Sequence, residues 1–417
     1  SDWLKNAFVF YCSPQITANY SMKQELICYS VLLYTGWPLA LAVRFLSGLL
    51  RLLPFPRAPL KKISASLTQQ LDENLDPKGG YRAGVGQYAS VWTRDSFFAL
   101  MAPLTDRHVR LRSLVDRLRD TMCPSTGQVP FTYCEVYYIM STLLGRPVRM
   151  PKAQARFNDE KWGSPVLDAN SQYVIMVHEA VLVNNDLDWL KSHMASIDRA
   201  LEWYDQFRSS GDLIDKEIPF GNFEDSLLHT GSIPYTNLLY LEALRRADLM
   251  RMCLGLDRKW ERHIVRVRPL TLKLIQSDRD TVTVSLAAFW LDGAEISDCM
   301  EAMIAEYPDT MTPNRWPPAS FRKVPLGFWV IGQQDYHRGF RWSWVGCLWA
   351  AALHHRGYKN EAKRVFARYE AVYRTYGTIH EVYDLESRPV SLACYKSESK
   401  FSEGLGCYLL AKKTLGD

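Results

Sequence analysis

Three neighbouring residues, Trp92, Arg94 and Asp95, place an indole ring, a guanidinium and a carboxylate within one turn of chain. An indole ring can stack on the apolar face of a pyranose. A guanidinium beside a carboxylate offers charged hydrogen bonds that vicinal hydroxyls can satisfy together. A structural ion pair at a helix start, with the tryptophan in the core, is the alternative interpretation. The segment therefore predicts a sugar-sized binding surface.

An acid pair further along the chain, Glu224 and Asp225, is suited to proton donation. It follows Ile218-Pro219-Phe220-Gly221 and precedes a helix expected from about Pro234. Apolar neighbours such as Phe223 raise the pKa of a carboxyl toward the range that a general acid needs. Adjacent loop residues do not point the same way, so only one of the two is the acid. We expect Asp225, with Glu224 as its rival and a solvated acid pair at a helix start as the structural alternative.

A second acidic segment near the C-terminus contains Glu381, which has the polar neighbours His380 and Asp384. A general base must ionise at working pH and hold a water molecule, and a loop with polar neighbours suits both needs. Glu398 and Glu403 are the rivals for this role, and a solvated acidic loop is the structural alternative for all three.

The composition limits the remaining classes of function. The chain has 417 residues, 47% hydrophobic and 23% charged, and a net charge of +5 with the basic residues scattered among acids. A folded protein is expected and nucleic-acid binding has little support. The nine cysteines contain no CxxC pair, which favours reduced thiols, and no His/Asp/Glu cluster has metal-ligand spacing. We expect neither a metal nor a cofactor.

The first 66 residues differ from the rest of the chain. No charged residue occurs from Leu26 to Val43, and basic residues then alternate with leucine and phenylalanine. Polar residues and Pro38 interrupt the apolar run, so we do not expect a spanning helix. The run starts too far from Ser1 and no small-residue cleavage site follows it, so we do not expect a cleavable signal peptide either. A buried helical hairpin is the preferred interpretation. A peripheral membrane contact through residues 23–62 is the alternative. We expect a soluble protein, in the cytoplasm unless this contact holds it at a membrane.

From residue 67 onward, helical spacing of apolar residues predominates. It recurs over residues 111–118, 173–183, 194–207, 238–252, 345–354 and 362–376. The best strand-like alternation is Thr281 to Leu286. Paired helices joined by aromatic loops predict an all-α toroid of helical hairpins, with an N-terminal extension over residues 1–66 and a catalytic barrel over residues 67–417.

Several motifs in order resemble those of the (α/α)6-barrel sugar-processing enzymes. These comprise glucoamylases, neutral invertases, glycogen-debranching glucosidases and the processing α-glucosidase I/mannosylglycerate hydrolase group. The matching segments are Trp92-Thr93-Arg94-Asp95-Ser96, Gly127-Gln128-Val129-Pro130, Leu167-Asp168-Ala169-Asn170, Asn222-Phe223-Glu224-Asp225-Ser226, Gly339-Phe340-Arg341-Trp342-Ser343-Trp344, His380-Glu381-Val382-Tyr383-Asp384 and Phe401-Ser402-Glu403-Gly404. Glu403 stands where many relatives carry tryptophan.

This resemblance implies an exo-acting, inverting glycoside hydrolase that removes an α-linked glucosyl or mannosyl unit from a small glycoside or oligosaccharide. It implies Asp225 as general acid and Glu381 as general base. The remaining residues implied for the substrate site are Trp92, Arg94, Asp95, Asp168, Glu224, Arg341, Trp342 and Trp344. Arg94 and Asp95 would hold hydroxyls of the terminal sugar. Arg341 would bind a hydroxyl or an acidic aglycone. The tryptophans would form walls on which the sugar rings stack. Trp342 and Trp344 alternate, so one of them is expected in the core.

Two other functions remain open. A phosphorylase of the same barrel type would need an anion site near the base, for which Arg388 and Lys396 are the local candidates. A non-catalytic, membrane-docked carbohydrate-binding protein would keep the aromatic cleft without the chemistry.

Overall fold

The computed structural model describes residues 62–137, 141, 147–159, 163–209, 211–306, 312, 314–316, 324, 335–337, 339–392 and 395–416. All of them belong to one compact unit that runs from Pro59 to Asp417. The predicted extension over residues 1–66, with its alternative membrane contact at residues 23–62, therefore lies almost entirely outside the described residues. Within the described ranges, no helix combines the length and the apolar character needed to cross a membrane.

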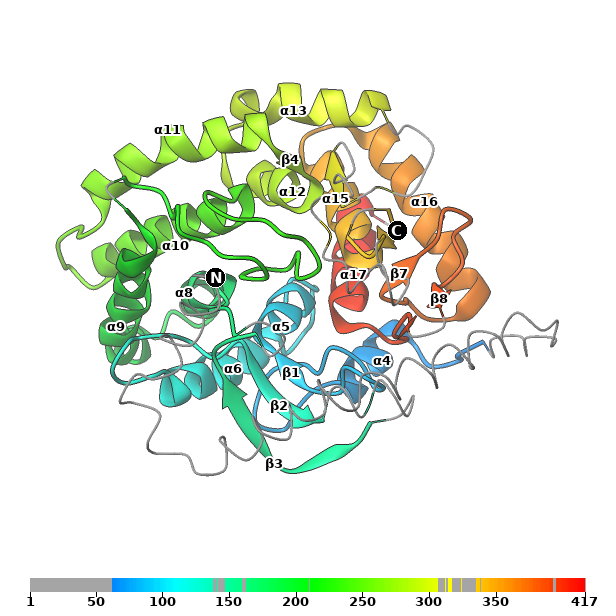
Figure 1. Cartoon of the computed structure of the whole chain (residues 1–417), viewed down its shortest axis with the longest axis horizontal. Helices are drawn as coiled ribbons and strands as arrows, with labels where there is room; N and C mark the ends of the chain where they lie inside the picture. The colour runs from blue at the N-terminus through cyan, green and yellow to red at the C-terminus, as the bar shows by residue number, and fades with distance from the viewer. Residues whose placement is uncertain are drawn as a thin grey trace, which may run out of the picture. The chain divides into compact units, whose positions relative to one another are not determined.

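Among the described residues, six helices form a closed inner ring (Figure 1). In ring order these are α5 (Thr93–Ala99), α8 (Asp168–Asn184), α10 (Pro234–Cys253), α12 (Thr281–Trp290), α15 (Ser343–His355) and α17 (Ser402–Leu415). Each packs against the next, and α17 packs against α5. An outer layer comprises α4 (Leu67–Glu73), α6 (Arg107–Thr121), α9 (Leu187–Glu202), α11 (Glu261–Ser277), α13 (Gly293–Glu306) and α16 (Lys359–Tyr376), with a 3-10 turn, η4 (Trp203–Phe207), after α9. The predicted (α/α)6 toroid is confirmed.

The two layers follow from the distribution of apolar residues. In the inner helix α15, every residue from Ser343 to Leu353 is buried, so the helix is covered on all sides. The outer helix α16 buries one face alone, made of Ala362, Val365, Phe366, Tyr369 and Val372. A helix that is apolar all round belongs inside, and a helix with one apolar stripe belongs at the surface.

The helical ranges predicted from residue spacing are confirmed, since they lie within α6, α8, α9 with η4, α10, α15 and α16. The strand-like prediction for Thr281 to Leu286 is wrong, because this segment forms the start of α12. Its threonines, valines and leucine are all buried, so their alternation does not separate a core face from a solvent face. The Asp280 carboxylate caps the helix by accepting a hydrogen bond of 2.7 Å from the Thr283 amide.

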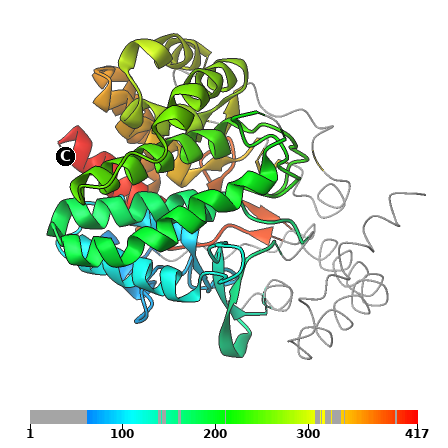
Figure 2. The ribbon, with the colours of Figure 1, turned by 90° about the vertical axis from the view of Figure 1, so that its left-hand side faces the viewer.

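Short antiparallel strands precede three of the inner helices. β1 (Val91–Trp92) pairs with β2 (Thr132–Val136), which in turn pairs with β3 (Arg149–Arg156). β4 (Arg279–Asp280) pairs with β5 (Arg315–Trp316). β6 (Arg341–Trp342) pairs with β7 (Val382–Tyr383). A further pair is β8 (Ser391–Leu392) with β9 (Tyr395–Lys396). β1, β4 and β6 continue directly into α5, α12 and α15. In the side view of Figure 2 the strands gather at one end of the helices, opposite the C-terminal end of α17.

Two glycines allow α17 to close the ring. A Cβ atom on Gly406 would overlap the backbone of Ala99 in α5, and one on Gly404 would overlap the Ser343 side chain in α15. Only glycine permits helix backbones to approach this closely. The start of α17 is therefore held tightly between the end of α5 and the first turn of α15.

Candidate active site

The predicted site residues meet at the N-terminal ends of the inner helices. Arg94 Nη1, in α5, donates a hydrogen bond of 3.2 Å to Asp168 Oδ2 at the start of α8. Arg94 Nε lies 3.7 Å from Glu403 Oε1 in the first turn of α17. Helix N-termini stabilise negative charge, which favours carboxylates in these first turns. Three helices thus bring one guanidinium and two carboxyl groups together.

The structure distinguishes the two adjacent acids, Glu224 and Asp225. Glu224 is 2% exposed, its Oε2 lies 2.8 Å from His229 Nδ1, and its Oε1 accepts a hydrogen bond of 2.9 Å from Asn314 Nδ2. The Asp225 side chain is 29% exposed, and its Oδ1 lies 4.0 Å from His337 Nδ1. Glu224 is thus held inside the loop, whereas Asp225 remains accessible to a substrate.

Contacts on both sides fix the loop that carries Asp225. The Leu167 amide, at the start of α8, donates a hydrogen bond of 2.7 Å to the Gly221 carbonyl. Phe223 packs edge-on against Tyr235 and Trp344, with ring centroids 4.7 and 5.5 Å apart. The Asp225 loop is therefore attached to the helix that also supplies Asp168.

A buried carboxyl next to this loop makes the stability of the fold depend on pH. Glu217 Oε1 accepts a hydrogen bond of 2.6 Å from Asn222 Nδ2, and its buried Oε2 has no hydrogen-bond partner in the described part. Burial, with smaller contributions from the charges of Asp168 and Glu224, raises the pKa of Glu217 from 4.5 to about 8. The folded state therefore retains a proton that the unfolded state loses above about pH 4.5, so stability falls as the pH rises toward 8.

We expect Glu217→Gln to raise the thermal midpoint relative to the wild type at about pH 8.5 and to change it little at about pH 5, because glutamine resembles the protonated acid. Thermal unfolding at both pH values measures the difference between the two proteins. An equal difference at both pH values would contradict the shift assigned to Glu217.

Glu381 lies at the entrance to β7 and is held from several sides. Its backbone carbonyl accepts a hydrogen bond of 3.0 Å from the Ser343 amide at the start of α15. Its buried carboxylate accepts hydrogen bonds from the hydroxyls of Tyr336 and Tyr395, the latter at 2.5 Å, and from the Glu398 amide at 3.3 Å. Burial raises the pKa of Glu381 to about 8, although these donors favour the ionised form. The Glu381 side chain is therefore fixed in position, and its pKa lies well above that of an exposed glutamate.

The adjacent residues Tyr336 and His337 connect the two candidate catalytic acids. The Tyr336 hydroxyl donates a hydrogen bond to Glu381, and burial followed by nearby charges, including those of Glu381 and Asp225, raises the pKa of this hydroxyl well above its usual value. The next residue, His337, approaches Asp225 and stacks on Trp342, with ring centroids 4.8 Å apart and planes 9° from parallel. Asp225 and Glu381 thus belong to one cluster rather than to separate surfaces.

Asp95 joins the same cluster. It is 4% exposed, and its pKa rises to about 7, first through burial and then through the negative charges of Asp168 and Asp225, whereas Arg94 opposes the rise. Glu403 is 2% exposed, and burial followed by the charges of Asp95 and Glu381 raises its pKa well above the usual value. Among the described residues, the cluster therefore carries more carboxyl groups than the Arg94 guanidinium can neutralise.

The aromatic residues of the predicted site differ in accessibility. Trp92 is half-buried, with its ring edge-on to Phe131 at 5.4 Å. Trp342 is buried, and its Nε1 donates a hydrogen bond of 2.8 Å to the Tyr336 carbonyl. Trp344 is buried against Phe98, with ring centroids 4.5 Å apart, and so occupies the core position expected for one of the pair. Trp92 is the tryptophan of the three that solvent reaches most.

Two further predicted residues have structural contacts. Arg341 is buried, donates a hydrogen bond of 2.8 Å to the Gly339 carbonyl and interacts with Tyr369 of the outer helix α16. Glu398, a rival for the base, accepts a hydrogen bond of 2.8 Å from the Gly86 amide, and a Cβ atom on Gly84 or Gly86 would overlap its side chain. Glu398 thus holds the turn that precedes β1.

Sequence reasoning missed Tyr336, Tyr395 and His337. Tyr336 and His337 belong to an irregular segment and Tyr395 to the two-residue strand β9, and neither is long enough or regular enough for a periodicity to mark a residue. The nearest signal is the position of Tyr336 and His337 just ahead of Gly339-Phe340-Arg341-Trp342.

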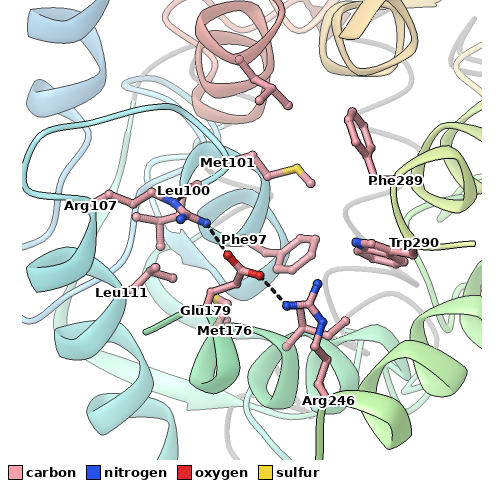
Figure 3. A pocket seen from close by; sticks show the side chains of 12 residues that line it. Phe97, Leu100, Met101, Arg107, Leu111, Met176, Glu179, Arg246, Phe289 and Trp290 are labelled. Atoms are coloured by element: carbon pink, nitrogen blue, oxygen red, sulfur yellow. Dashed lines mark hydrogen bonds and ion pairs between the residues drawn. The ribbon is translucent and has the colours of Figure 1, made fainter. Parts of the chain in front are cut away.

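A hollow lies at the opposite ends of the inner helices from the candidate active site (Figure 3). Its volume is about 260 Å³, and apolar side chains such as Phe97, Phe289 and Trp290 line it. Glu179 bridges Arg107 and Arg246 there, at 3.2 and 2.5 Å. It contains none of the predicted site residues. In the described ranges, no group of histidine, cysteine, aspartate and glutamate is arranged to hold a metal ion.

The inner and outer rings define the chain as an (α/α)6 toroid, the fold of a class of glycoside hydrolases. Comparison with solved structures supports this fold. A mannosylglycerate hydrolase of glycoside hydrolase family 63 from Thermus thermophilus, in complex with glucose, superimposes with a TM-score of 0.56 at 13% identity, over 82% of this chain and 98% of that one. A glycosidase variant in complex with glucose superimposes with a TM-score of 0.58 at 14% identity, over 84% of this chain and 96% of that one. No model of a known protein family matches the sequence, and no curated protein matches it.

Proposed function

We propose that the protein is an exo-acting, inverting glycoside hydrolase that removes an α-linked glucosyl or mannosyl unit from a small glycoside or oligosaccharide. The observation that carries the proposal is the pairing of an accessible acid, Asp225, with a fixed, buried acid, Glu381, through the adjacent residues Tyr336 and His337. Two carboxyl groups with different surroundings are what glycosidic cleavage requires.

In this mechanism Asp225 protonates the leaving oxygen while Glu381 removes a proton from the attacking water. The tyrosine hydroxyls orient the Glu381 carboxylate. Inversion requires the two carboxyl groups to stand roughly 6.5–9.5 Å apart, so that the water fits between base and sugar. Arg94, Asp95 and Asp168 would bind the hydroxyls of the terminal sugar. Charged residues that close the end of the site favour exo action.

The structural relatives support a carbohydrate substrate, since two of them are described in complex with glucose. The phosphorylase alternative has less support. Arg388 forms ion pairs with Asp384 and Glu386 at 2.9 and 2.8 Å, and Lys396 is exposed, so neither provides a buried anion site.

The direct test is to incubate the protein with a panel of α-glucosides and α-mannosides, with and without inorganic phosphate, and to follow the released sugar by proton NMR. We expect phosphate-independent release of a β-configured monosaccharide from the non-reducing end. An α-configured first product would remove Glu381 from the role of base, and phosphate-dependent release of a sugar phosphate would favour the phosphorylase.

A further inference from the structure

Two carboxyl groups of the site lack hydrogen-bond partners from other described residues. Arg94 is hydrogen-bonded to Asp168, and the Glu381 carboxylate is held by two tyrosine hydroxyls. Glu403 Oε1, by contrast, is buried without a hydrogen bond from any described residue, and the Asp95 carboxyl accepts a hydrogen bond from its own backbone amide. Both side chains are more than nine-tenths buried.

A buried carboxyl without a donor is costly, and a folded protein normally provides one. Glu403 also stands where many similar barrels carry tryptophan, so this chain has a carboxyl group in place of an apolar ring. Arg94 forms an ion pair with Glu403, but the 3.7 Å between Arg94 Nε and Glu403 Oε1 is longer than a hydrogen bond, so this oxygen still lacks a donor. The arrangement fits a donor that arrives with the substrate.

The charge of the site indicates what kind of donor fits. In the described part of the chain, Asp95, Asp168 and Glu403 share the guanidinium of Arg94, and Glu403 is also affected by the negative charge of Glu381. A cation brought by a ligand would relieve the repulsion between Asp95 and Glu403, whereas a hydroxyl would supply a hydrogen bond alone.

We propose that Glu403 and Asp95 form a cation subsite that makes the enzyme prefer a sugar residue bearing a protonated amino group. The inference rests on the proposed function only in requiring that a sugar enter this site. The ammonium group would lie between the two carboxylates and donate a hydrogen bond to Glu403. Glu403 is thus a specificity-determining residue, separate from the proposed acid and base.

The test is calorimetric titration of the whole chain, at about pH 6, with glucose and with amino-glucoses that carry the amine at carbon 2, 3 or 6. We expect at least one amino-glucose to bind on the order of ten-fold more tightly than glucose, which is the effect of one charge-assisted hydrogen bond. Titration in two buffers of different ionisation enthalpy should also show that the amine displaces a proton from the carboxyl groups, and that glucose does not.

Glu403→Gln should reduce the preference to less than about three-fold, and Glu403→Trp, which restores the common residue, should abolish it. Glu370→Gln removes a carboxylate from the outer helix α16, where Glu370 pairs with Arg374, and should keep the wild-type preference. Circular dichroism checks folding, and Asp95→Asn provides a second variant with the same expected loss of preference.

The outcomes separate the two proposals. If glucose and every amino-glucose bind with equal affinity, or if Glu403→Gln retains the preference, the cation subsite is wrong while a sugar site stands. If none of the monosaccharides binds, the sugar site itself is wrong, and the subsite with it.

Discussion

Asp225→Asn is expected to lower kcat on an α-glycoside by roughly 10²–10⁴-fold, because asparagine cannot protonate the leaving oxygen. Substrate binding should change much less, since Asp225 is one of several groups around the sugar. A glycosyl fluoride provides the decisive comparison. Its leaving group needs no proton, so the variant should recover most of the wild-type rate on that substrate. Steady-state kinetics on both substrates measures the effect.

Glu224→Gln is the matched control for this prediction. The Glu224 carboxylate contacts His229 and Asn314 inside the loop. Glu224→Gln should therefore lower the thermal midpoint, while its effect on kcat should be much smaller than that of Asp225→Asn. A large fall in kcat for Glu224→Gln, together with fluoride rescue for that variant and none for Asp225→Asn, would reverse the assignment of the acid.

Glu381→Gln is expected to have an effect of similar size, roughly 10²–10⁴-fold on kcat, because glutamine cannot accept a proton from water. In contrast with Asp225→Asn, the loss should be as large on a glycosyl fluoride as on an ordinary glycoside, since attack by water is needed in both cases. Glu398→Gln is the control, because Glu398 holds the turn at Gly86 rather than the reacting groups. Equal losses in the two variants would remove the distinction between Glu381 and its rival.

Tyr336→Phe tests how the base is positioned. The hydroxyl favours the ionised carboxylate, so its removal should move the pKa of Glu381 further above its present value of about 8. The variant should therefore lose activity near neutral pH and regain part of it as the pH rises toward about 9. A profile of kcat/KM against pH that keeps the wild-type shape would contradict this role of Tyr336.

The fold was predictable because the helices of the two layers leave clear and different patterns in the chain. The apolar stripes of α9 and α16 and the continuous apolar run of α15 required no knowledge of distant residues. Thr281 to Leu286 was mistaken for a strand because β-branched residues in a fully buried helix lose the 3.6-residue period. In that segment the surroundings in the ring decided the conformation.

The site was predictable where it lies at helix starts and not where it depends on loops. Arg94, Asp95 and Asp168 occupy first turns of inner helices, and the ring brings such turns together. The choice between Glu224 and Asp225 depends on His229 and Asn314, and the fixing of Glu381 depends on tyrosines that precede β6 and belong to β9. Those contacts join segments far apart in the chain, and no local pattern in the sequence encodes them.

The position of α17 has a consequence for biosynthesis. Gly406 packs on Ala99, so the last of the six inner helices in chain order must dock onto the first, and this same helix delivers Glu403 to the site. Such distant pairings form slowly. A nascent chain therefore lacks Glu403, and with it a complete candidate site, until α17 has left the ribosome and docked against α5.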